Sequence, residues 1–199
     1  MGTKSVQTGS FRIPPLDRDA VTCVAIGAST GAPTQIQHML AGLPADLPVP
    51  VLIAQHLPPA FSVSFANTLA RVSPLTVVHG EDGMPLLPGS VYVGEGHKHM
   101  RVRRWAAGRM HLEISEKPAE LPFKPSVDEL LRSCATYFGA GTLAFVMTGI
   151  GRDGTEGAGA VRAAGGVVIA QDEASSAVYG MPRSCFEAGH AWESRLIAA

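Results

Sequence analysis

The sequence predicts an α/β fold, namely a doubly wound, mostly parallel sheet with helices on both faces in a Rossmann-like three-layer arrangement, plus one β-hairpin excursion. Three observations support this prediction. Short apolar runs rich in β-branched residues alternate with segments of helical periodicity over nearly the whole chain. Glycine and proline separate these segments, as they do at turns. The 199 residues, 46% of them hydrophobic, suffice for one sizeable core, so we expect a single domain.

The expected domain covers residues 20–199. Residues 1–19 are polar, contain Pro14 and Pro15 and show no hydrophobic period, so we interpret them as a disordered linker or a remnant of cloning. No run approaches the ~18 apolar residues of a membrane span, and the N-terminus has no signal-peptide core. The three cysteines are widely spaced, which favours buried free thiols in a reducing compartment. We therefore expect a cytoplasmic protein.

Charge and ligand patterns exclude several classes of function. The sequence has 16 Lys and Arg residues against 17 Asp and Glu residues. This balance gives no electrostatic footprint, so we expect no nucleic-acid partner and no direct membrane insertion. No His, Cys or carboxylate spacing matches a zinc or two-metal pattern. We therefore expect neither a metal nor a cofactor.

In the first part of the domain the sequence predicts three strands and two helices. Apolar runs predict strands at 21–26, 49–54 and 75–78. Each helix begins near a proline and keeps one apolar face, which in the first helix has the i, i+3, i+4, i+7 spacing. These faces consist of Ile36, Met39, Leu40 and Leu43 in the first helix and of Phe61, Phe65, Leu69 and Val72 in the second.

The middle of the domain, from 80 to 115, changes to short alternating runs separated by turns, which predicts hairpins. The runs are 91–93, 99–103 and 110–114. A basic cluster lies in the second run and beside Trp105; it comprises Arg101, Arg103 and Arg104. Because arginine alternates with Val102 there, we interpret the cluster as the solvated face of a strand rather than a nucleic-acid patch.

In the second half of the domain the sequence predicts three helices and two strands. A capping box at 126–129 begins the first helix: the Ser126 hydroxyl accepts the Glu129 amide, and the Glu129 carboxylate reaches back. An apolar stripe continues this helix to 138. The later elements are strands at 142–147 and 167–170, a helix from 155 that ends at 165–166, and a helix at 182–188.

The turn after the first strand, GASTG at 27–31, matches the G-x-S-x-G pattern that lifts a serine hydroxyl clear of a sheet. Ser29 is then a candidate nucleophile. The same turn is also compatible with a backbone nest for phosphate at a helix N-terminus, or with a plain connection. These five residues alone leave all three interpretations open.

Three loops carry the residue types of a serine-hydrolase triad. Ser29, His56 and Asp153 each follow a predicted strand, and the carboxyl ends of such strands converge on one crevice. Acyl transfer needs a base within reach of the serine and a third group that orients the base. Asp172, also at a strand end, is an alternative orienting acid. The histidines interpreted as exposed or structurally satisfied are His38, His79, His97, His99, His111 and His190.

Donors for a developing oxyanion are expected from two turns. The amide after the nucleophile belongs to Thr30, and the glycine-rich turn at 149–151 contributes a second region, with Ile150 and Gly151. Two rival functions remain. An esterase of the α/β-hydrolase type orders its triad as serine, acid, histidine, and would pair Asp153 or Asp172 with His190. A non-enzymatic module would instead hold a phosphorylated ligand at 27–31.

Several long motifs, in one order, cover the chain from about 24 to 192. They are IGASTGAP at 26–33, QHLPPAFSVSFA at 55–66, EDGMPLLPGSVYV at 81–93, KPSVDELLRS at 124–133, MTGIGRDGTEG at 147–157 and IAQDEASSAVYGMPR at 169–183. With these motifs the sequence resembles the catalytic domain of the chemotaxis protein-glutamate methylesterases, the CheB family. By this resemblance, Ser29, His56 and Asp153 match the family's catalytic residues.

The resemblance implies hydrolysis of glutamate γ-methyl esters on the cytoplasmic helices of methyl-accepting chemotaxis receptors, with release of methanol. It also implies deamidation of receptor glutamines. Two departures from the family pattern stand near the site: Ile150 replaces a methionine, and Phe123-Lys124 replaces His-Arg. Full-length members carry an N-terminal receiver domain, and no segment here resembles one. We therefore expect a receiver domain as a partner, in cis or in trans. The chain itself is expected to be a stand-alone form, an excised domain or part of a larger signalling protein.

Overall fold

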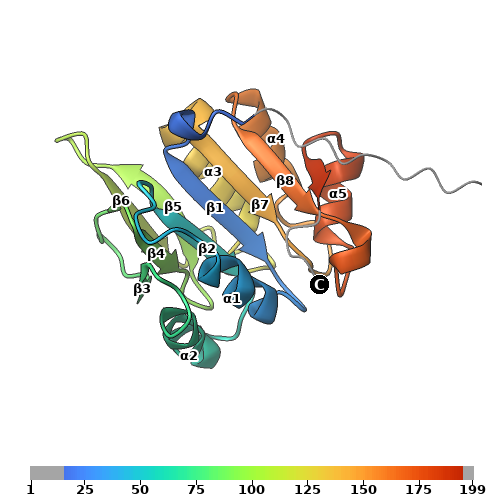
Figure 1. Ribbon diagram of the computed structural model, residues 1–199, viewed down its shortest axis with the longest axis horizontal. Helices are drawn as coiled ribbons and strands as arrows, with labels where there is room; N and C mark the ends of the chain where they lie inside the picture. The colour runs from blue at the N-terminus through green and yellow to red at the C-terminus, as the bar shows by residue number, and fades with distance from the viewer. Residues whose placement is uncertain (1–15, 195–199) are drawn as a thin grey trace, which may run out of the picture.

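The computed structural model describes residues 16–194 and has a seven-stranded parallel sheet at its centre (Figure 1). The strand order is β3-β4-β2-β1-β7-β8-β9. The strands of this sheet are β1 (Cys23–Ala28), β2 (Val51–Gln55), β3 (Thr76–His79), β4 (Ser90–Val93), β7 (Thr142–Val146), β8 (Val167–Gln171) and β9 (Trp192–Ser194). The predicted α/β fold class is confirmed.

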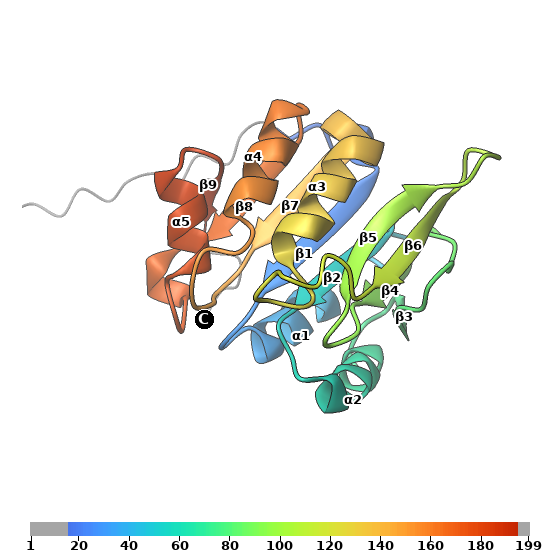
Figure 2. The same cartoon turned by 180° about the vertical axis from the view of Figure 1, so that it is seen from behind.

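Helices cover both faces of the sheet. The helices are α1 (Pro33–Ala41), α2 (Pro59–Ala70), α3 (Val127–Phe138), α4 (Thr155–Ala163) and α5 (Met181–Glu187), with single 3₁₀ turns η1 (Arg18–Ala20), η2 (Gly139–Gly141) and η3 (Glu173–Ser175). Figure 1 shows α1 and α2 on the near side of the sheet. Figure 2, seen from behind, shows α3 and α4 on the opposite side, next to a separate hairpin of β5 (His99–Arg104) and β6 (Met110–Ser115).

Two hydrophobic cores form because successive strand residues point to opposite faces. In β1, Cys23 and Ala25 belong to the core under α3, α4, α5 and the hairpin, whereas Ile26 and Ala28 belong to the core under α1 and α2. Strands buried on both faces read as continuous apolar runs, which is the pattern that predicts them. Of the predicted apolar face of α2, Phe65 and Leu69 are buried but Phe61 is exposed.

The topology places one end of β1 at the centre of the molecule. From β1 the chain builds the sheet outward through β2, then returns to the other side of β1 with β7. The strand order therefore reverses between β1 and β7, and ligands of open α/β sheets bind at the carboxyl ends of strands beside such a switch point. This is the edge at which the candidate site lies.

Two elements differ from the prediction. Residues 91–93, predicted in a hairpin, belong to β4, which pairs in parallel with both β2 and β3. That prediction was wrong because a short apolar run between turns looks the same in a hairpin and in a parallel pair of strands. β9 was not predicted; it pairs in parallel with β8 through three residue pairs.

The hairpin packs against α3 and corrects one further prediction. Arg101, expected on a solvated strand face, is 8% exposed, because that face of β5 turns toward α3. Its guanidinium pairs with Glu113 of β6 and with Glu129 of α3. Arg103 and Arg104 are exposed, as predicted. One of the three arginines of the basic cluster is therefore structural, and the other two are solvated.

The predictions for the chain ends and the cysteines have mixed outcomes. Residues 1–15 of the expected linker lie outside the described residues, and Arg18–Ala20 form the turn η1. The three cysteines, which are Cys23, Cys134 and Cys185, are buried free thiols, as predicted. Among residues 16–194, no helix combines the length and apolar character needed to cross a bilayer.

Gly27 lets β1 and α3 pack in close contact. A Cβ atom at Gly27 would lie 2.1 Å from Cγ1 of Val127, a side chain that is itself fully buried. We expect Gly27→Ala to lower the free energy of unfolding by about 1–3 kcal/mol through overpacking, measured by urea denaturation.

Two variants serve as controls for this prediction. Gly27→Ala combined with Val127→Ala should recover part of the loss, as a coupling energy in a double-mutant cycle. Gly42→Ala should be tolerated, because a Cβ there would meet no atom closer than 3.7 Å. If Gly27→Ala destabilises no more than Gly42→Ala does, close packing at Gly27 is not the constraint.

Candidate active site

Ser29, the predicted nucleophile, lies in the turn between β1 and α1. Its amide donates to the Thr148 carbonyl (3.0 Å), and its carbonyl accepts from Nε2 of Gln55 (2.9 Å). Both sides of the turn are therefore held by the neighbouring strands. Within residues 16–194 the Ser29 hydroxyl makes no hydrogen bond, to His56 or to any other residue, and Ser29 is 9% exposed.

The turn after β7 approaches Ser29 closely. A Cβ at Gly149 would lie 2.6 Å from the Cβ of Ser29 and 2.4 Å from Sδ of Met181. Only glycine fits in this space. The 149–151 turn and the serine turn are therefore in close contact.

His56, the predicted base, follows β2 directly. Its amide donates to the Ala28 carbonyl (2.9 Å), which holds the residue beside the end of β1. Its Nε2 lies 2.8 Å from Oδ2 of Asp153, and both side chains are largely buried. On its face the ring stacks against Phe123, with centroids 4.7 Å apart and planes 6° from parallel. The ring is thus fixed by an edge contact and a face contact.

Asp153 lies at the N-terminus of α3, although it belongs to the loop after β7. Its carboxylate accepts hydrogen bonds from the Ser126 hydroxyl (3.0 Å) and from the amides of Val127 (2.8 Å) and Asp128 (3.0 Å). These are amides that have no partner inside the helix, and the helix dipole favours negative charge there.

The environment keeps Asp153 ionised. Burial raises the pKa of this carboxyl, but the hydrogen bonds from His56 and from the Val127 and Asp128 amides outweigh burial, so the pKa lies below its usual value. The neighbouring Asp128 shows the opposite balance: burial, with help from the Asp153 charge, raises its pKa, although its carboxylate accepts the Gly157 amide. The pKa of Asp153 is therefore shifted down and that of Asp128 up.

The predicted capping box at 126–129 is half correct. The Ser126 hydroxyl accepts the Glu129 amide (3.4 Å), as predicted. The Glu129 carboxylate does not reach back; it pairs with Arg101 and Arg132 instead. The Ser126 hydroxyl gains a second role that the pattern did not suggest, because it donates to Asp153.

Candidate oxyanion donors face the same edge of the sheet. Within the described range, the amides of Thr30, Ile150 and Gly151 have no hydrogen-bond acceptor. The Thr148 hydroxyl donates to the Thr30 carbonyl (2.9 Å) and accepts the Val178 amide (2.9 Å), so it fixes the serine turn to the loop before α5. Ile150 is 60% exposed, so the contribution expected from it to this site is its backbone amide.

The alternative residues occupy other places. Asp172 caps η3 and accepts the Ser175 amide (3.0 Å). The ring of His190 lies against Gly159, in the middle of α4, where a Cβ would meet its Nε2 at 3.0 Å. An α/β-hydrolase arrangement would need His190 beside Asp153 or Asp172, whereas the histidine on Asp153 is His56.

Two clefts lie on either side of Phe123. One, of about 500 Å³, is lined by His56, Leu57, Pro58, His97, Ala119, Leu121, Pro122, Phe123 and Lys124. The other, of about 250 Å³, is lined by Leu121, Pro122, Phe123, Ser126, Asp128, Arg132, Arg152 and Asp153. The segment that carries Phe123 therefore forms the wall between them and covers the His56–Asp153 pair.

Sequence reasoning assigned no supporting role to three residues that hold this arrangement, although it expected His99 to be exposed or structurally satisfied. Gln55 donates to the carbonyls of both Ser29 (2.9 Å) and His56 (3.2 Å). Thr148 and His99 hold loops through buried side chains. Gln55 and Thr148 stand at strand ends beside predicted site residues, and that position is the one signal that pointed to them.

Comparison with known proteins gives a consistent result. A family model described as CheB methylesterase matches residues 24–197. The protein-glutamate methylesterase/protein-glutamine glutaminase 1 of Oleidesulfovibrio alaskensis is 45% identical over 166 residues, which are 83% of this chain and 45% of that protein. The corresponding protein of Desulfitobacterium hafniense is 43% identical over 195 residues, 94% of this chain and 50% of that protein.

The fold agrees as well. The crystal structure of the Thermotoga maritima CheB methylesterase catalytic domain matches with a TM-score of 0.83 and 36% identity, covering 87% of this chain and 91% of that chain. The chain spans about half the length of the curated relatives it matches. With the family model covering nearly all of the described residues, the chain belongs to the CheB methylesterase family.

Proposed function

We propose that this chain hydrolyses γ-methyl esters of glutamate side chains in methyl-accepting chemotaxis receptors, releasing methanol, and deamidates receptor glutamines. The observation that carries the proposal is the His56–Asp153 hydrogen bond of 2.8 Å beside Ser29, at the switch point of the sheet. The names of the relatives, protein-glutamate methylesterase/protein-glutamine glutaminase, supply the substrate class.

In this proposal Ser29 is the nucleophile, His56 the base and Asp153 the orienting acid. Nε2 of His56 is occupied by Asp153, whereas Nδ1 is buried and has no partner among the described residues. Nδ1 is therefore the nitrogen that takes the Ser29 proton as the hydroxyl oxygen attacks the ester carbonyl. The ionised Asp153 stabilises the imidazolium that forms.

The tetrahedral intermediate carries a negative oxygen, for which amides of Thr30, Ile150 and Gly151 are the donors in this proposal. Imidazolium Nδ1–H then protonates the leaving methoxide, and methanol departs. Water, deprotonated by His56, attacks the acyl-Ser29 ester and releases the glutamate carboxylate. With a glutamine side chain, the same steps release ammonia and leave glutamate.

The proposed partners follow from the same assignment. The substrate is presented on the cytoplasmic helices of the receptors, so the chain would act in the cytoplasm. A receiver domain, in the same polypeptide or in a separate one, is the expected regulator. The balanced charge of the sequence, 16 basic against 17 acidic residues, supports recognition by local contacts rather than by a general electrostatic field.

Methanol release from a methylated receptor fragment tests the proposal. We expect the chain to release methanol, His56→Ala to lose this activity, and His190→Ala to retain it, because the histidine that contacts Asp153 within residues 16–194 is His56. Loss of activity in His190→Ala alone would favour the α/β-hydrolase alternative. Absence of methanol release from correctly folded wild-type protein, with no labelling of Ser29 by a fluorophosphonate, would contradict the proposal.

A further inference from the structure

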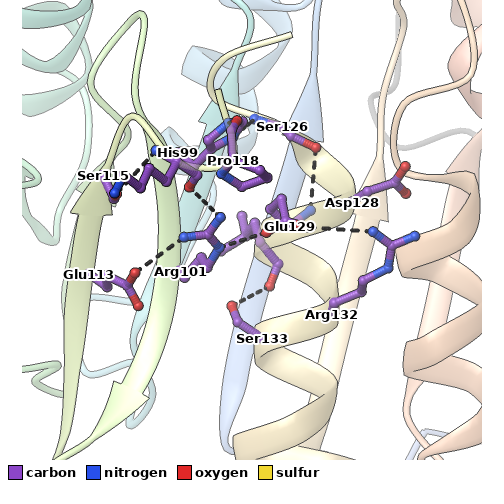
Figure 3. Close-up of polar contacts among 12 residues, drawn as sticks. His99, Arg101, Glu113, Ser115, Pro118, Ser126, Asp128, Glu129, Arg132 and Ser133 are labelled. Atoms are coloured by element: carbon purple, nitrogen blue, oxygen red, sulfur yellow. Dashed lines mark hydrogen bonds and ion pairs between the residues drawn. The ribbon is translucent and has the colours of Figure 1, made fainter. Parts of the chain in front are cut away.

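His99 is a fully buried histidine that the proposed mechanism does not use. It is the first residue of β5, and both nitrogens of its ring are hydrogen-bonded (Figure 3). Nδ1 accepts the Ser126 amide (3.2 Å), and Nε2 lies 3.0 Å from the Pro118 carbonyl oxygen. An amide can only donate and a carbonyl can only accept, so these partners fix the neutral tautomer with hydrogen on Nε2.

The environment keeps this imidazole neutral. Burial lowers the pKa of His99, and although the Pro118 carbonyl and the Glu129 charge act in the opposite direction, the Arg101 and Lys124 charges add to the effect of burial. A neutral ring is the form that Nδ1 needs in order to accept the Ser126 amide. The role of His99 is therefore structural: Nδ1 accepts one hydrogen bond, and Nε2–H donates another.

The two partners of His99 mark the two ends of one segment. The segment from 118 to 126 leaves β6, passes over the site and enters α3. Phe123, within this segment, stacks on the His56 ring, and Ser126, at its end, donates its hydroxyl to Asp153. One imidazole thus joins the ends of the segment that contacts both His56 and Asp153.

We propose that His99 is a positioning residue for the triad, through the Ser126 amide and the Pro118 carbonyl that it holds. The proposal rests on the proposed function of Ser29, His56 and Asp153. Without His99, the 118–126 segment loses its cross-connection, Ser126 moves relative to Asp153, and the His56 ring loses its fixed orientation. Misplacement by about 1 Å lowers turnover by about 10²-fold.

Arg101 holds the same region at adjacent points and does not replace His99. Its guanidinium donates to the Glu129 carboxylate, as Figure 3 shows, and to the Lys117 carbonyl. Lys117 and Glu129 lie just outside the segment, one on each side. Neither contact reaches the Ser126 amide or the Pro118 carbonyl. In the absence of the imidazole those two groups would stay buried without partners, which is unfavourable.

Three substitutions separate the two hydrogen bonds of His99. Asparagine places its carbonyl oxygen where Nδ1 lies, so His99→Asn keeps the acceptor for Ser126 and loses the donor for Pro118. Glutamine reaches the position of Nε2, so His99→Gln keeps the donor and loses the acceptor. His99→Phe keeps a planar ring and loses both. Val102→Ala, a buried position on the same strand, is the matched control for loss of stability alone.

Steady-state methanol release and urea denaturation are measured for all five proteins. We expect kcat to fall about 10²-fold in His99→Gln and His99→Phe, with KM changed much less, because substrate binding does not involve His99. We expect His99→Asn to lose threefold to tenfold, roughly the effect of one neutral hydrogen bond. Val102→Ala should lose stability and keep kcat. Equal kcat in all three His99 variants and in Val102→Ala would overturn the inference.

A second measurement separates this inference from the proposed function. The Nε2–H proton of His56, hydrogen-bonded to Asp153, should give a downfield proton NMR signal in the wild-type protein. We expect this signal to shift or broaden in His99→Gln and to persist in Val102→Ala. If the wild type releases no methanol, the proposed function fails and the NMR comparison still decides the inference. An unchanged signal in His99→Gln overturns it.

Discussion

Ser29→Ala is expected to lower methyl-ester hydrolysis on the order of 10⁶-fold, the effect seen when a catalytic serine is removed from a triad that acts as a unit. The fold should remain, because the Ser29 hydroxyl makes no hydrogen bond within residues 16–194, and its backbone bonds to Thr148 and Gln55 do not depend on the side chain. Methanol release measures the first effect. Thermal unfolding measures the second, with a change within about 0.5 kcal/mol.

Ser64→Ala is a suitable control for Ser29→Ala. Ser64 is exposed on α2, and its hydroxyl donates to the Phe61 carbonyl of the same helix, so its replacement should leave turnover unchanged. A fluorophosphonate should label the wild type and the control but not the Ser29 variant. Substantial methanol release by a folded Ser29→Ala protein would mean that another group, or water, makes the attack on the ester.

The three residues of the candidate triad were predictable because each one follows a strand of a parallel sheet. Ser29 had a turn motif, His56 had only its place after an apolar run, and Asp153 had its glycine-rich loop. Since the carboxyl ends of parallel strands meet at one edge, position alone predicted that the three residues lie at the same edge of the sheet. The 2.8 Å contact between His56 and Asp153 agrees with that reasoning.

The positioning residues were not predictable in this way. Alternation along β5 shows that His99 and Arg101 share a face, but it does not show what covers that face. The cover is α3, whose first turn begins 28 residues after His99 with Val127. Such pairing across the fold decides whether a polar side chain is solvated or buried. The parallel pairing of β4 with β2 and β3 was missed for the same reason, because the sequence of a strand does not show which strands lie beside it.

Asp153→Asn is expected to lower kcat by about 10⁴-fold, because the wrong tautomer of His56 becomes favoured. The carboxylate accepts four hydrogen bonds, from His56, the Ser126 hydroxyl and the amides of Val127 and Asp128. An asparagine amide can accept at only one of its two positions. If its NH₂ faces His56, it donates to Nε2 and leaves the proton on Nδ1, where the Ser29 proton has to go.

The same substitution is expected to lower the free energy of unfolding. Either orientation of the amide leaves one backbone N–H, of Val127 or of Asp128, without an acceptor and reverses a second hydrogen bond. The lost hydrogen bond to a charged acceptor is worth about 1.5–3 kcal/mol, and we expect a loss of at least this size. Urea denaturation at neutral pH measures it. Asp46→Asn, at an exposed position, is the control and should change stability by less than about 0.5 kcal/mol.

The pH dependence of stability gives an independent check on Asp153. Its pKa in the folded protein lies below the value of about 3.9 for an unfolded chain. The unfolded state therefore binds more protons between those two values, and the contribution of Asp153 to stability is fully present above about pH 4 and lost as the pH falls through the folded pKa. The difference in unfolding free energy between the wild type and Asp153→Asn should shrink over that interval. A difference that stays constant down to about pH 2 would mean that the hydrogen bonds at the N-terminus of α3 do not stabilise the charged form of this carboxyl.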